Sequence, residues 1–326
     1  MPHSGSISVA LCSYNGEKYI GRQLQSIAAQ TRLPSELVIY DDCSTDSTAE
    51  IVQSFARSVA FPVRFIANTE NQGAIKKGIT RNFEKASQLC TGRLIAFCDQ
   101  DDEWFPEKLA CMAAVLERDP QNGGVFSDAQ LIDSQSTPTG ATLWQTNGFD
   151  KASQSKMLQG ESLSVLLSMT KVYGCTLMID ARLLDQILPV PPSWWFDAWL
   201  ACMVAVQSKL TFVPEPLLSY RIHPSQQVGA KVLSLSERLR RWRLSPKQYR
   251  DETYPQLTEL YERLSSQDNP AIASHLQYVR GRLDLIELRS SLPSNRLLRF
   301  TKVLRNRRRY HLYFNGWKSI IKDLTA

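Results

Sequence analysis

Short apolar runs alternate with helix-spaced apolar positions along the first 120 residues of the chain. Each run has the length and the β-branched or aromatic content that is typical of a strand. The predicted strands cover 7–11, 36–40, 63–66 and 93–97, and the predicted helices cover about 17–30, 46–56, 80–89 and 106–117. Strands and helices that alternate through short connections predict an α/β fold, with a mostly parallel sheet and helices on both of its faces.

The pattern changes after residue 132. Residues 133–160 are rich in Ser, Thr, Gln and Gly and have weak periodicity, which predicts a long loop. We expect further strands at 172–179 and 210–213, with Pro214 and Pro216 ending the second of them. The intervening helices are predicted at 183–188 and 194–206, and from about residue 233 onward the chain is predicted to be helical and amphipathic.

Composition is that of a soluble globular protein, with 43% hydrophobic and 21% charged residues. The longest apolar run, 198–206, is too short to span a membrane, and the first residues show no secretory signal. The seven cysteines include no Cys-x-x-Cys pair. They therefore argue against a disulfide framework or a structural zinc site, and they favour the cytoplasm.

Charge is distributed unevenly between two expected domains, 1–230 and 231–326. The first carries 18 Lys+Arg against 23 Asp+Glu, a net charge of −5, whereas the second carries 20 against 9, a net charge of +11. This asymmetry predicts that the C-terminal region, and not the body, meets a polyanion.

Three carboxylates lie within four positions directly after the strand predicted at 93–97. Asp99, Asp101 and Asp102 emerge at the carboxyl end of that strand, and this is the edge at which open α/β sheets bind ligands. Acids this close repel one another unless a cation lies among them, and Mg²⁺ or Mn²⁺ binds carboxylates together with substrate phosphates. The cluster therefore favours a metal–diphosphate site. The alternative is an acidic surface turn that caps the next helix.

A second acidic stretch, 41–46, follows the second strand in the same way, and Asp42 lies in it. A carboxylate at this place can accept a hydrogen bond from a ribose hydroxyl or a pyrimidine N–H, and helix capping is a compatible alternative. Two acidic strand ends on one edge predict a common crevice. A dinucleotide oxidoreductase is disfavoured because no G-x-G-x-x-G turn follows the first strand, and the absence of a G-x-x-x-x-G-K-[ST] motif excludes a P-loop hydrolase.

Five stretches, in order and spacing, resemble the signature of family 2 glycosyltransferases. They are Ser8-Val-Ala-Leu-Cys-Ser-Tyr-Asn15, Val38-Ile-Tyr-Asp-Asp-Cys-Ser-Thr-Asp-Ser-Thr48, Asn71-Gln-Gly73, Arg81-Asn82 and Phe97-Cys-Asp-Gln-Asp-Asp-Glu-Trp104. The resemblance implies a GT-A fold, a nucleotide-sugar donor, a divalent metal ion and inversion at the anomeric carbon. The Asp-Gln-Asp-Asp-x-Trp form, with Tyr220-Arg-Ile-His223 later, is most similar to rhamnosyltransferase-like bacterial members that build surface polysaccharides.

The resemblance also implies roles for individual residues on the donor side. Asp42 is expected at the pyrimidine base, Asp99 near the ribose and metal, and Asp101 on the metal that bridges the two phosphates. Asp102 matches the next acidic position of the motif. The residues expected to flank the nucleotide are Ser13, Tyr14 and Asn15. Arg81, predicted with Asn82 at a helix start, suits the diphosphate; the alternative is an exposed helix-start residue.

The acceptor side needs a general base, because a sugar hydroxyl is a poor nucleophile. Asp197 lies among aromatic residues in Trp194-Trp-Phe-Asp-Ala-Trp-Leu200, a setting that raises a carboxyl pKa. It matches the family's base position, although Phe196 replaces the His or Glu that often precedes the base; the alternative is a helix cap. His223 is expected near the metal or diphosphate, and a structural histidine is its alternative.

The segment 296–309 carries seven Lys+Arg and no acid, with apolar residues between them and Tyr310, Leu312, Tyr313, Phe314 and Trp317 after them. This pattern predicts attachment to an anionic membrane on its cytoplasmic face, which suits a lipid-linked glycan acceptor. The alternative is a solvated helix packed on the body. We expect a hexosyltransferase, with dTDP-rhamnose or a UDP-hexose as donor. The alternatives are an Asp-based phosphatase, a non-catalytic glycan- or lipid-binding protein and a nucleic-acid-binding protein.

Overall fold

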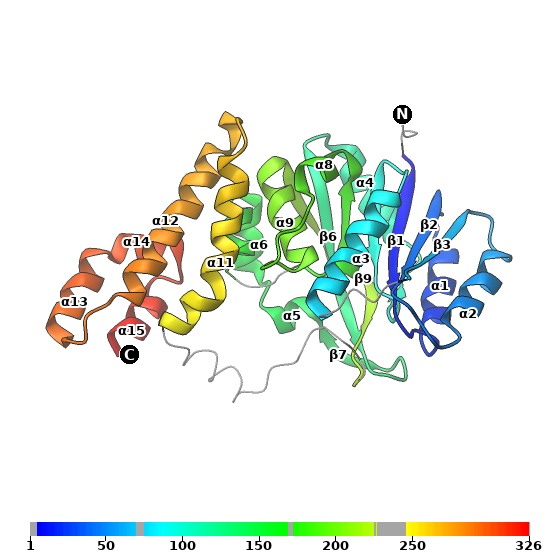
Figure 1. Cartoon of the computed structure of the whole chain (residues 1–326), viewed down its shortest axis with the longest axis horizontal. Coiled ribbons are helices and arrows are strands. Elements are labelled where there is room, and N and C mark those ends of the chain that lie inside the picture. The colour runs from blue at the N-terminus through cyan, green and yellow to red at the C-terminus, as the bar shows by residue number, and fades with distance from the viewer. Residues whose placement is uncertain (1–4, 70–74, 169–171, 225, 227–245, 326) are drawn as a thin grey trace. The chain divides into compact units, whose positions relative to one another are not determined.

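The chain divides into two compact units, Met1–Lys231 and Val232–Ala326. The computed structural model describes residues 5–69, 75–168, 172–224, 226 and 246–325 of the 326 (Figure 1). Two stretches that carry predictions lie outside the described residues. They are the Asn71–Gly73 part of the family signature and the first part, 233–245, of the expected C-terminal helices.

A nine-stranded sheet forms the centre of the first unit. Its strands are β1 (Ile7–Ser13), β2 (Glu36–Asp41), β3 (Val63–Ala67), β4 (Leu94–Cys98), β5 (Glu103–Trp104), β6 (Asn122–Ile132), β7 (Pro138–Thr142), β8 (Leu177–Asp180) and β9 (Lys209–Arg221). The order across the sheet is β3-β2-β1-β4-β8-β6-β9-β5, with β7 paired to β6. β1 to β4 are parallel, as are β6 and β9, while β5, β7 and β8 pair antiparallel with their neighbours. The carboxyl ends of β1, β2 and β4 therefore meet at one edge.

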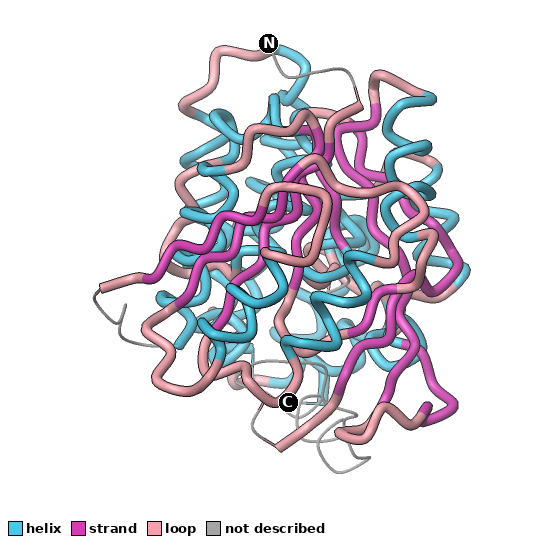
Figure 2. Tube along the Cα trace, turned by 90° about the vertical axis from the view of Figure 1, so that its right-hand side faces the viewer, coloured by secondary structure: helices cyan, strands magenta, loops and turns pink. Residues whose placement is uncertain are grey.

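Helices cover both faces of this sheet, as the end-on view in Figure 2 shows. They are α1 (Ile20–Ala28), α2 (Thr48–Ala56), α3 (Ile75–Leu89), α4 (Lys108–Arg118), α5 (Leu143–Asn147), α6 (Lys151–Leu158), α7 (Ser162–Leu166), α8 (Leu184–Ile187) and α9 (Phe196–Gln207). Alternate residues of β1, β2 and β4 form one apolar cluster with α1, α2 and α4. On the other face Phe97 of β4 packs against Phe83 of α3 and Phe196 of α9, with ring centroids 6.2 and 5.0 Å apart. Burial on both faces explains the continuous apolar runs, and the predicted α/β architecture is confirmed.

The prediction that Pro214 and Pro216 end the strand at 210–213 is wrong. β9 continues to Arg221, because its pairing with β6 jumps from Ser127 opposite Val213 to Asp128 opposite Pro216. Pro214 thus lies in a bulge, where the missing N–H removes no bond from the ladder. The extended strand brings Arg221 to the turn after β4 that contains Asp99, Asp101 and Asp102, which we call the acidic turn.

The loop predicted at 133–160 is also wrong, because this stretch holds β7, α5 and α6. Short-range capping forms these helices. Thr142 and Gln145 make a capping box at the start of α5, and Gly148, with φ 69°, ends that helix. Asp150 then caps α6 by accepting a hydrogen bond from the Ser153 N–H. Such caps involve polar residues, so hydrophobic periodicity could not predict them.

The second unit is helical over the residues described, as expected. Its helices are α11 (Pro246–Ser265), α12 (Ala273–Ser290), α13 (Arg296–Arg305), α14 (Arg307–Tyr313) and α15 (Trp317–Thr325). Their core contains a buried ion pair in which Arg289 donates to both oxygens of Asp323, at 2.7 and 2.8 Å, and Tyr310 also donates to Asp323 at 2.6 Å. In the described part of the chain no helix combines the length and apolar character needed to cross a membrane.

Candidate active site

Two adjacent aspartates end β2 and have different surroundings. Asp41 is buried, and its carboxylate accepts hydrogen bonds from the hydroxyls of Ser13 and Ser44, both at 2.6 Å. Asp42 is half-buried and accepts from Asn68 Nδ2 at 3.2 Å. Asp41 therefore shapes the strand end, while Asp42, predicted at the pyrimidine base, keeps a partly exposed carboxylate at this edge.

The turn after β1 is tied to the acidic turn by one side chain. The Tyr14 N–H donates to Gln100 Oε1 at 2.9 Å, and Gln100 Nε2 donates to the Tyr14 carbonyl at 3.0 Å. A Cβ atom at Gly16 would lie 2.3 Å from the same Oε1, so a side chain at position 16 would displace the Gln100 amide and disturb these two hydrogen bonds. Asn15 adopts a φ of 46°, and its N–H donates to Ser44 Oγ at 2.8 Å. Among the residues expected to flank the nucleotide, Tyr14 is exposed, whereas Ser13 is buried against β2.

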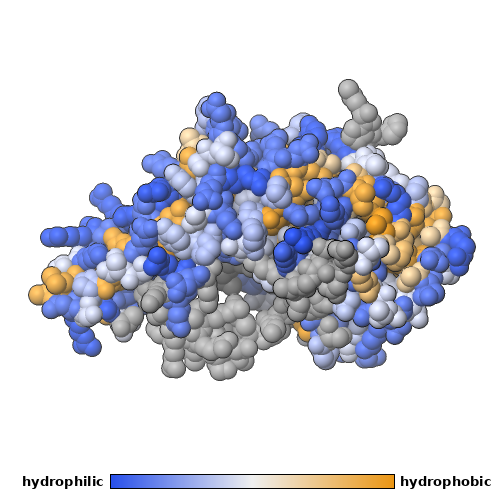
Figure 3. Space-filling model, viewed as in Figure 1, coloured by the Kyte–Doolittle hydropathy of each residue, from blue (hydrophilic) through white to orange (hydrophobic). Residues whose placement is uncertain are grey.

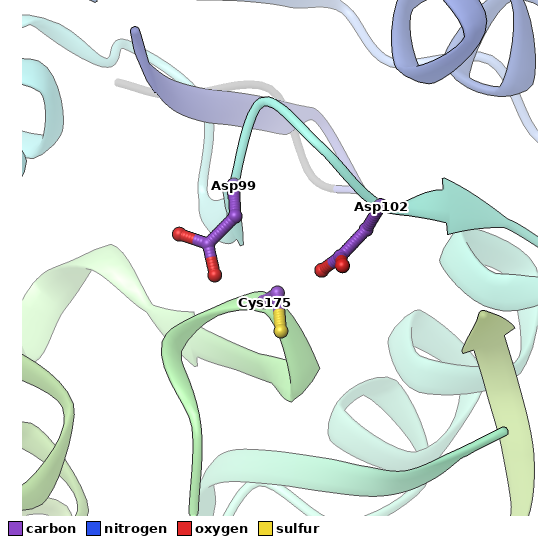
Figure 4. A group of neighbouring side chains, drawn as sticks. All are labelled: Asp99, Asp102 and Cys175. Atoms are coloured by element: carbon purple, nitrogen blue, oxygen red, sulfur yellow. The ribbon is translucent and has the colours of Figure 1, made fainter. Parts of the chain in front are cut away.

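The turn after β4 brings Asp99 and Asp102 together with Cys175, a residue that precedes β8 (Figure 4). One potential ligand atom from each of the three lies within 4.8 Å of the others. Burial first, and then the charge of Asp101, raises the pKa of Asp99 to about 7 and that of Asp102 well above its usual range. One oxygen of Asp102, Oδ2, is buried without a hydrogen-bond partner among the described residues. A cation beside these carboxyl groups would offset both the burial and the like charges, so the surroundings fit a divalent ion.

The Asp101 carboxylate points toward His223, the remaining residue predicted to bind the metal ion. Its Oδ2 lies 2.8 Å from His223 Nε2, and both side chains are largely buried, 13% and 6% exposed. The His223 ring lies against Tyr19, with centroids 4.7 Å apart, which fixes the imidazole. Carboxylate oxygens with one imidazole nitrogen form a donor set that suits Mn²⁺ or Mg²⁺. The structure thus places Asp101 beside His223, while the ligand atoms of Asp99 group with those of Asp102 and Cys175. Among the described residues no such group joins Asp99 to Asp101 and His223.

Arg221, the last residue of β9, holds the acidic turn in place. Its backbone N–H donates to Asp102 Oδ1 at 3.0 Å, and its Nε donates to the Asp101 carbonyl at 2.7 Å. The guanidinium is fully buried, pairs with Glu103 at 2.5 Å and lies 4.8 Å from the centre of the Tyr19 ring. Sequence analysis assigned it no function, because the contacts with Asp102 and Asp101 join positions 119 and 120 residues apart.

Lys108, at the first turn of α4, is a second buried cation beside the acidic turn. Its Nζ donates to the Cys175 carbonyl at 2.9 Å and lies 4.9 Å from the centre of the Trp104 ring. Burial lowers the pKa of Lys108 to about 8. Cys175 is in a short 3₁₀ turn, Gly174–Thr176, so Lys108 anchors that turn.

Asp197 lies in the first turn of α9. The backbone of Gly174, in the same 3₁₀ turn as Cys175, donates a hydrogen bond to the Asp197 carboxylate. Its Oδ1 accepts the Ala198 N–H at 2.7 Å. Burial raises the pKa of Asp197 to about 6, although hydrogen bonds from the Ala198 and Gly174 N–H groups lower it in part. The charge of Asp197 also raises the pKa of Asp99, so the two carboxyl groups share one electrostatic environment. A buried carboxyl group with a pKa of about 6 can accept a proton from a hydroxyl group placed beside it.

Arg81 is not at a helix start, contrary to prediction. α3 begins at Ile75, so Arg81 lies near its middle, where backbone N–H groups are bonded within the helix and cannot bind a phosphate. It lines a cavity of about 270 Å³ together with Tyr40, Asn82, Lys85 and Pro189, among others.

The fold agrees with a known class of solved structures. The crystal structure of S. aureus TarS 1-349 in complex with UDP-GlcNAc superimposes with a TM-score of 0.60, covering 98% of this chain and 90% of that chain at 17% sequence identity. At this identity the likeness shows the fold alone. The chain has the GT-A glycosyltransferase fold, as expected.

Sequence comparison is consistent with that class. Residues 8–158 match the family model described as Glycosyl transferase family 2. An uncharacterized glycosyltransferase of Nostoc sp. is 27% identical over 241 residues, 71% of this chain and 69% of the relative. The putative teichuronic acid biosynthesis glycosyltransferase TuaG of Bacillus subtilis is 37% identical over 103 residues, which are 32% of this chain and only 38% of the relative. Residues 8–158, just under half of the chain, therefore match the glycosyltransferase family 2 domain.

Proposed function

We propose that the protein is an inverting, metal-dependent glycosyltransferase that moves a hexose from a nucleotide-sugar donor onto a bacterial surface glycan, with catalysis in residues 1–230. One observation carries the proposal. The Asp101 carboxylate and the His223 imidazole lie 2.8 Å apart, the charge of Asp101 raises the pKa of Asp99, and the acidic end of β2 lies on the same sheet edge. A nucleoside diphosphate needs a base site and a metal site on one edge, and this arrangement supports both.

The donor side of the proposed site uses residues that follow the ends of four strands, β1, β2, β4 and β9. Asp42 would accept a hydrogen bond from the pyrimidine N–H, and the exposed Tyr14 would flank the nucleotide. Asp101, Asp99 and His223 would hold the divalent cation. When bound, the cation would supply Lewis-acid stabilisation of the charge on the departing diphosphate.

The acceptor side uses Asp197. With a pKa raised to about 6, its carboxyl is mostly ionised at neutral pH and can still take a proton from a sugar hydroxyl. The deprotonated oxygen would attack the anomeric carbon opposite the leaving diphosphate, and attack from that side inverts the configuration.

Substrates are proposed from the family resemblance and from the relatives. TarS binds UDP-GlcNAc and TuaG is named for teichuronic acid biosynthesis. We propose a hexose donor, with dTDP-rhamnose tested first and UDP-hexoses second, and a lipid-linked acceptor such as growing O-antigen or capsule. An acceptor of this kind would place the enzyme on the cytoplasmic face of the cell membrane.

A donor panel tests this function. The full chain is heated with dTDP-, UDP- and GDP-sugars, each with Mn²⁺, with Mg²⁺ or with a chelator. A ligand that binds the folded state at about 100 times its Kd adds about 2.7 kcal/mol of stability, so one donor should raise Tm by a few degrees only when metal is present. Asp101→Asn should remove this metal-dependent rise, while Asp185→Asn, at an exposed position of α8, serves as the matched control.

Two results would contradict the proposal. Absence of stabilisation by every donor with either metal would favour the glycan- or lipid-binding alternative. Release of inorganic phosphate without sugar transfer would favour the phosphatase alternative.

A further inference from the structure

Large apolar side chains are exposed mainly on the last helices of the described chain. Nine such side chains are exposed among the described residues, and six of these lie between 297 and 321. They are Leu297, Leu298, Phe300, Leu312, Trp317 and Ile321. Single exposed apolar residues are ordinary, but a concentration of them marks a contact surface.

These six residues remain exposed after the second unit has formed its core. Val303, Tyr310 and Ile320, from α13, α14 and α15, turn inward with Leu285 to make that core. Tyr310 was expected to be an interfacial residue, and the structure buries it completely. The exposed Trp317 ring contacts His311 of α14, with centroids 5.5 Å apart, so the outer faces of α14 and α15 are continuous there.

Exposed cations lie on the same three helices. They are Arg296, Arg305, Arg307, Arg308 and Lys318. The single acid of residues 296–325 is Asp323, which is buried and paired with Arg289. At the left-hand end of Figure 3, over α13, orange apolar and blue polar residues adjoin one another. We call these six apolar and five basic residues the apolar–basic surface.

We propose that the apolar–basic surface binds an anionic lipid membrane, with the apolar side chains entering the boundary between headgroups and acyl chains. Arg and Lys would lie at the lipid phosphates, and this combination is typical of helices that lie in the interface. The same surface of a second copy of the chain would bring like charges together, and a nucleic acid would leave the apolar side chains without a partner. The proposal does not depend on the activity of the first unit.

Vesicle flotation with the full chain tests the proposal. The protein should float with phosphatidylcholine vesicles that contain phosphatidylglycerol and remain unbound with phosphatidylcholine alone. Leu297→Ser/Phe300→Ser should weaken binding about tenfold or more, since both apolar contacts are lost. Arg307→Gln/Arg308→Gln should weaken binding by a similar factor and reduce its salt dependence.

Matched control variants distinguish binding through the apolar–basic surface from nonspecific binding through any exposed apolar or basic residue. Leu158→Ser changes a side chain of the first unit that is 71% exposed, as Leu297 is, and Arg57→Gln/Lys151→Gln removes two exposed cations of the first unit. Both controls should bind vesicles as the unmodified protein does, and donor-dependent Tm shifts should be unchanged in all four variants.

Three outcomes would overturn the proposal. The first is equal binding to neutral and anionic vesicles, or to neither. The second is a concentration-dependent dimer that the Leu297→Ser/Phe300→Ser variant abolishes. The third is tighter binding to duplex or single-stranded DNA than to vesicles at the same salt concentration.

Discussion

Neighbouring acidic residues have different surroundings at two strand ends. Asp41 is buried and bonded to two serines, while Asp42 keeps a partly exposed carboxylate. In the acidic turn, Asp102 accepts from the backbone of β9, while Asp101 meets His223. Position in the sequence predicted that carboxylates would gather at this edge. Sequence position could not show which of these carboxylates is structural and which is free to bind a ligand, because that depends on the strand that each one contacts in the fold.

Asp197→Asn should lower kcat about 10²- to 10⁴-fold, the usual contribution of a general base. For the unmodified enzyme, the pKa of about 6 means that the rate should rise with pH through 6 and level off above 7, and the variant should lose this rise. The measurement is kcat against pH, with donor-dependent Tm shifts as the folding control. An unchanged rising limb in the variant would exclude Asp197 as the base.

The raised pKa of the Asp197 carboxyl group also predicts how the stability of the fold depends on pH. Its folded pKa is raised above the usual carboxyl value of 3.8, so the folded state binds the proton more tightly than the unfolded state does. Asp197 therefore lowers the free energy of unfolding as pH rises from about 4 to 6. Urea unfolding at pH 4.5 and 7.5 should show that Asp197→Asn gains stability relative to the unmodified protein at the higher pH. A loss there would mean that the carboxylate stabilises the fold.

Lys108→Met should lower kcat about tenfold while leaving the donor-dependent Tm shift in place. The reason is positional. Lys108 anchors the Cys175 carbonyl, and the neighbouring Gly174 N–H bonds to Asp197, so the variant should also move the rising limb of the pH profile. Loss of one buried hydrogen bond costs about 1–2 kcal/mol, and Thr176→Val, which removes a hydroxyl bond within the same turn, is the stability control. A lower Tm with an unchanged pH profile would show that Lys108 is merely structural.

Elements whose identity rests on apolar patterning were predicted well, and elements that rest on polar or distant contacts were not. β1, β2, β3 and β4 agree with their predicted ranges to within two residues at either end. β6 was missed because Gly123, Gly124 and Asp128 interrupt its pattern, yet it is the longest partner of β9. Pro214 and Pro216 were predicted to end the strand, because a bulge can be recognised only when the partner strand is known.

Helix α15 is held by a buried ion pair as well as by apolar packing, and the ion pair predicts a large effect of substitution. Asp323→Asn leaves the Arg289 guanidinium buried without its counter-charge, which should cost about 3–5 kcal/mol. Hydrogen exchange of α15 amides in the full chain should accelerate accordingly. Asp284→Asn removes solvent-exposed pairs with Arg280 and Arg309 and should cost less than about 1 kcal/mol. Equal effects of the two substitutions would contradict the assignment.

On the scale of the whole molecule, charge follows the division into two units. The first 230 residues are net acidic and contain the carboxylate edge, while the remainder is net basic and contains the apolar–basic surface. This separation was evident in the sequence, because counting charges needs no structure. The buried cations Arg221 and Lys108 were not evident as parts of the site, because their partners lie 119 and 67 positions away.

The close contact between Gly16 and the Gln100 side chain predicts that the effect of a substitution at one of these positions depends on the residue at the other. A side chain at 16 would occupy the space of the Gln100 amide, so the flexible end of Gln100 would have to turn away and release the Tyr14 backbone. Shortening position 100 first releases the Tyr14 backbone and leaves a gap that a larger residue at 16 could then fill. We therefore expect a substitution at 16 to disturb the turn after β1 less when position 100 already carries a shorter side chain. The residue between Asp99 and Asp101 is thus coupled to a glycine 84 positions earlier.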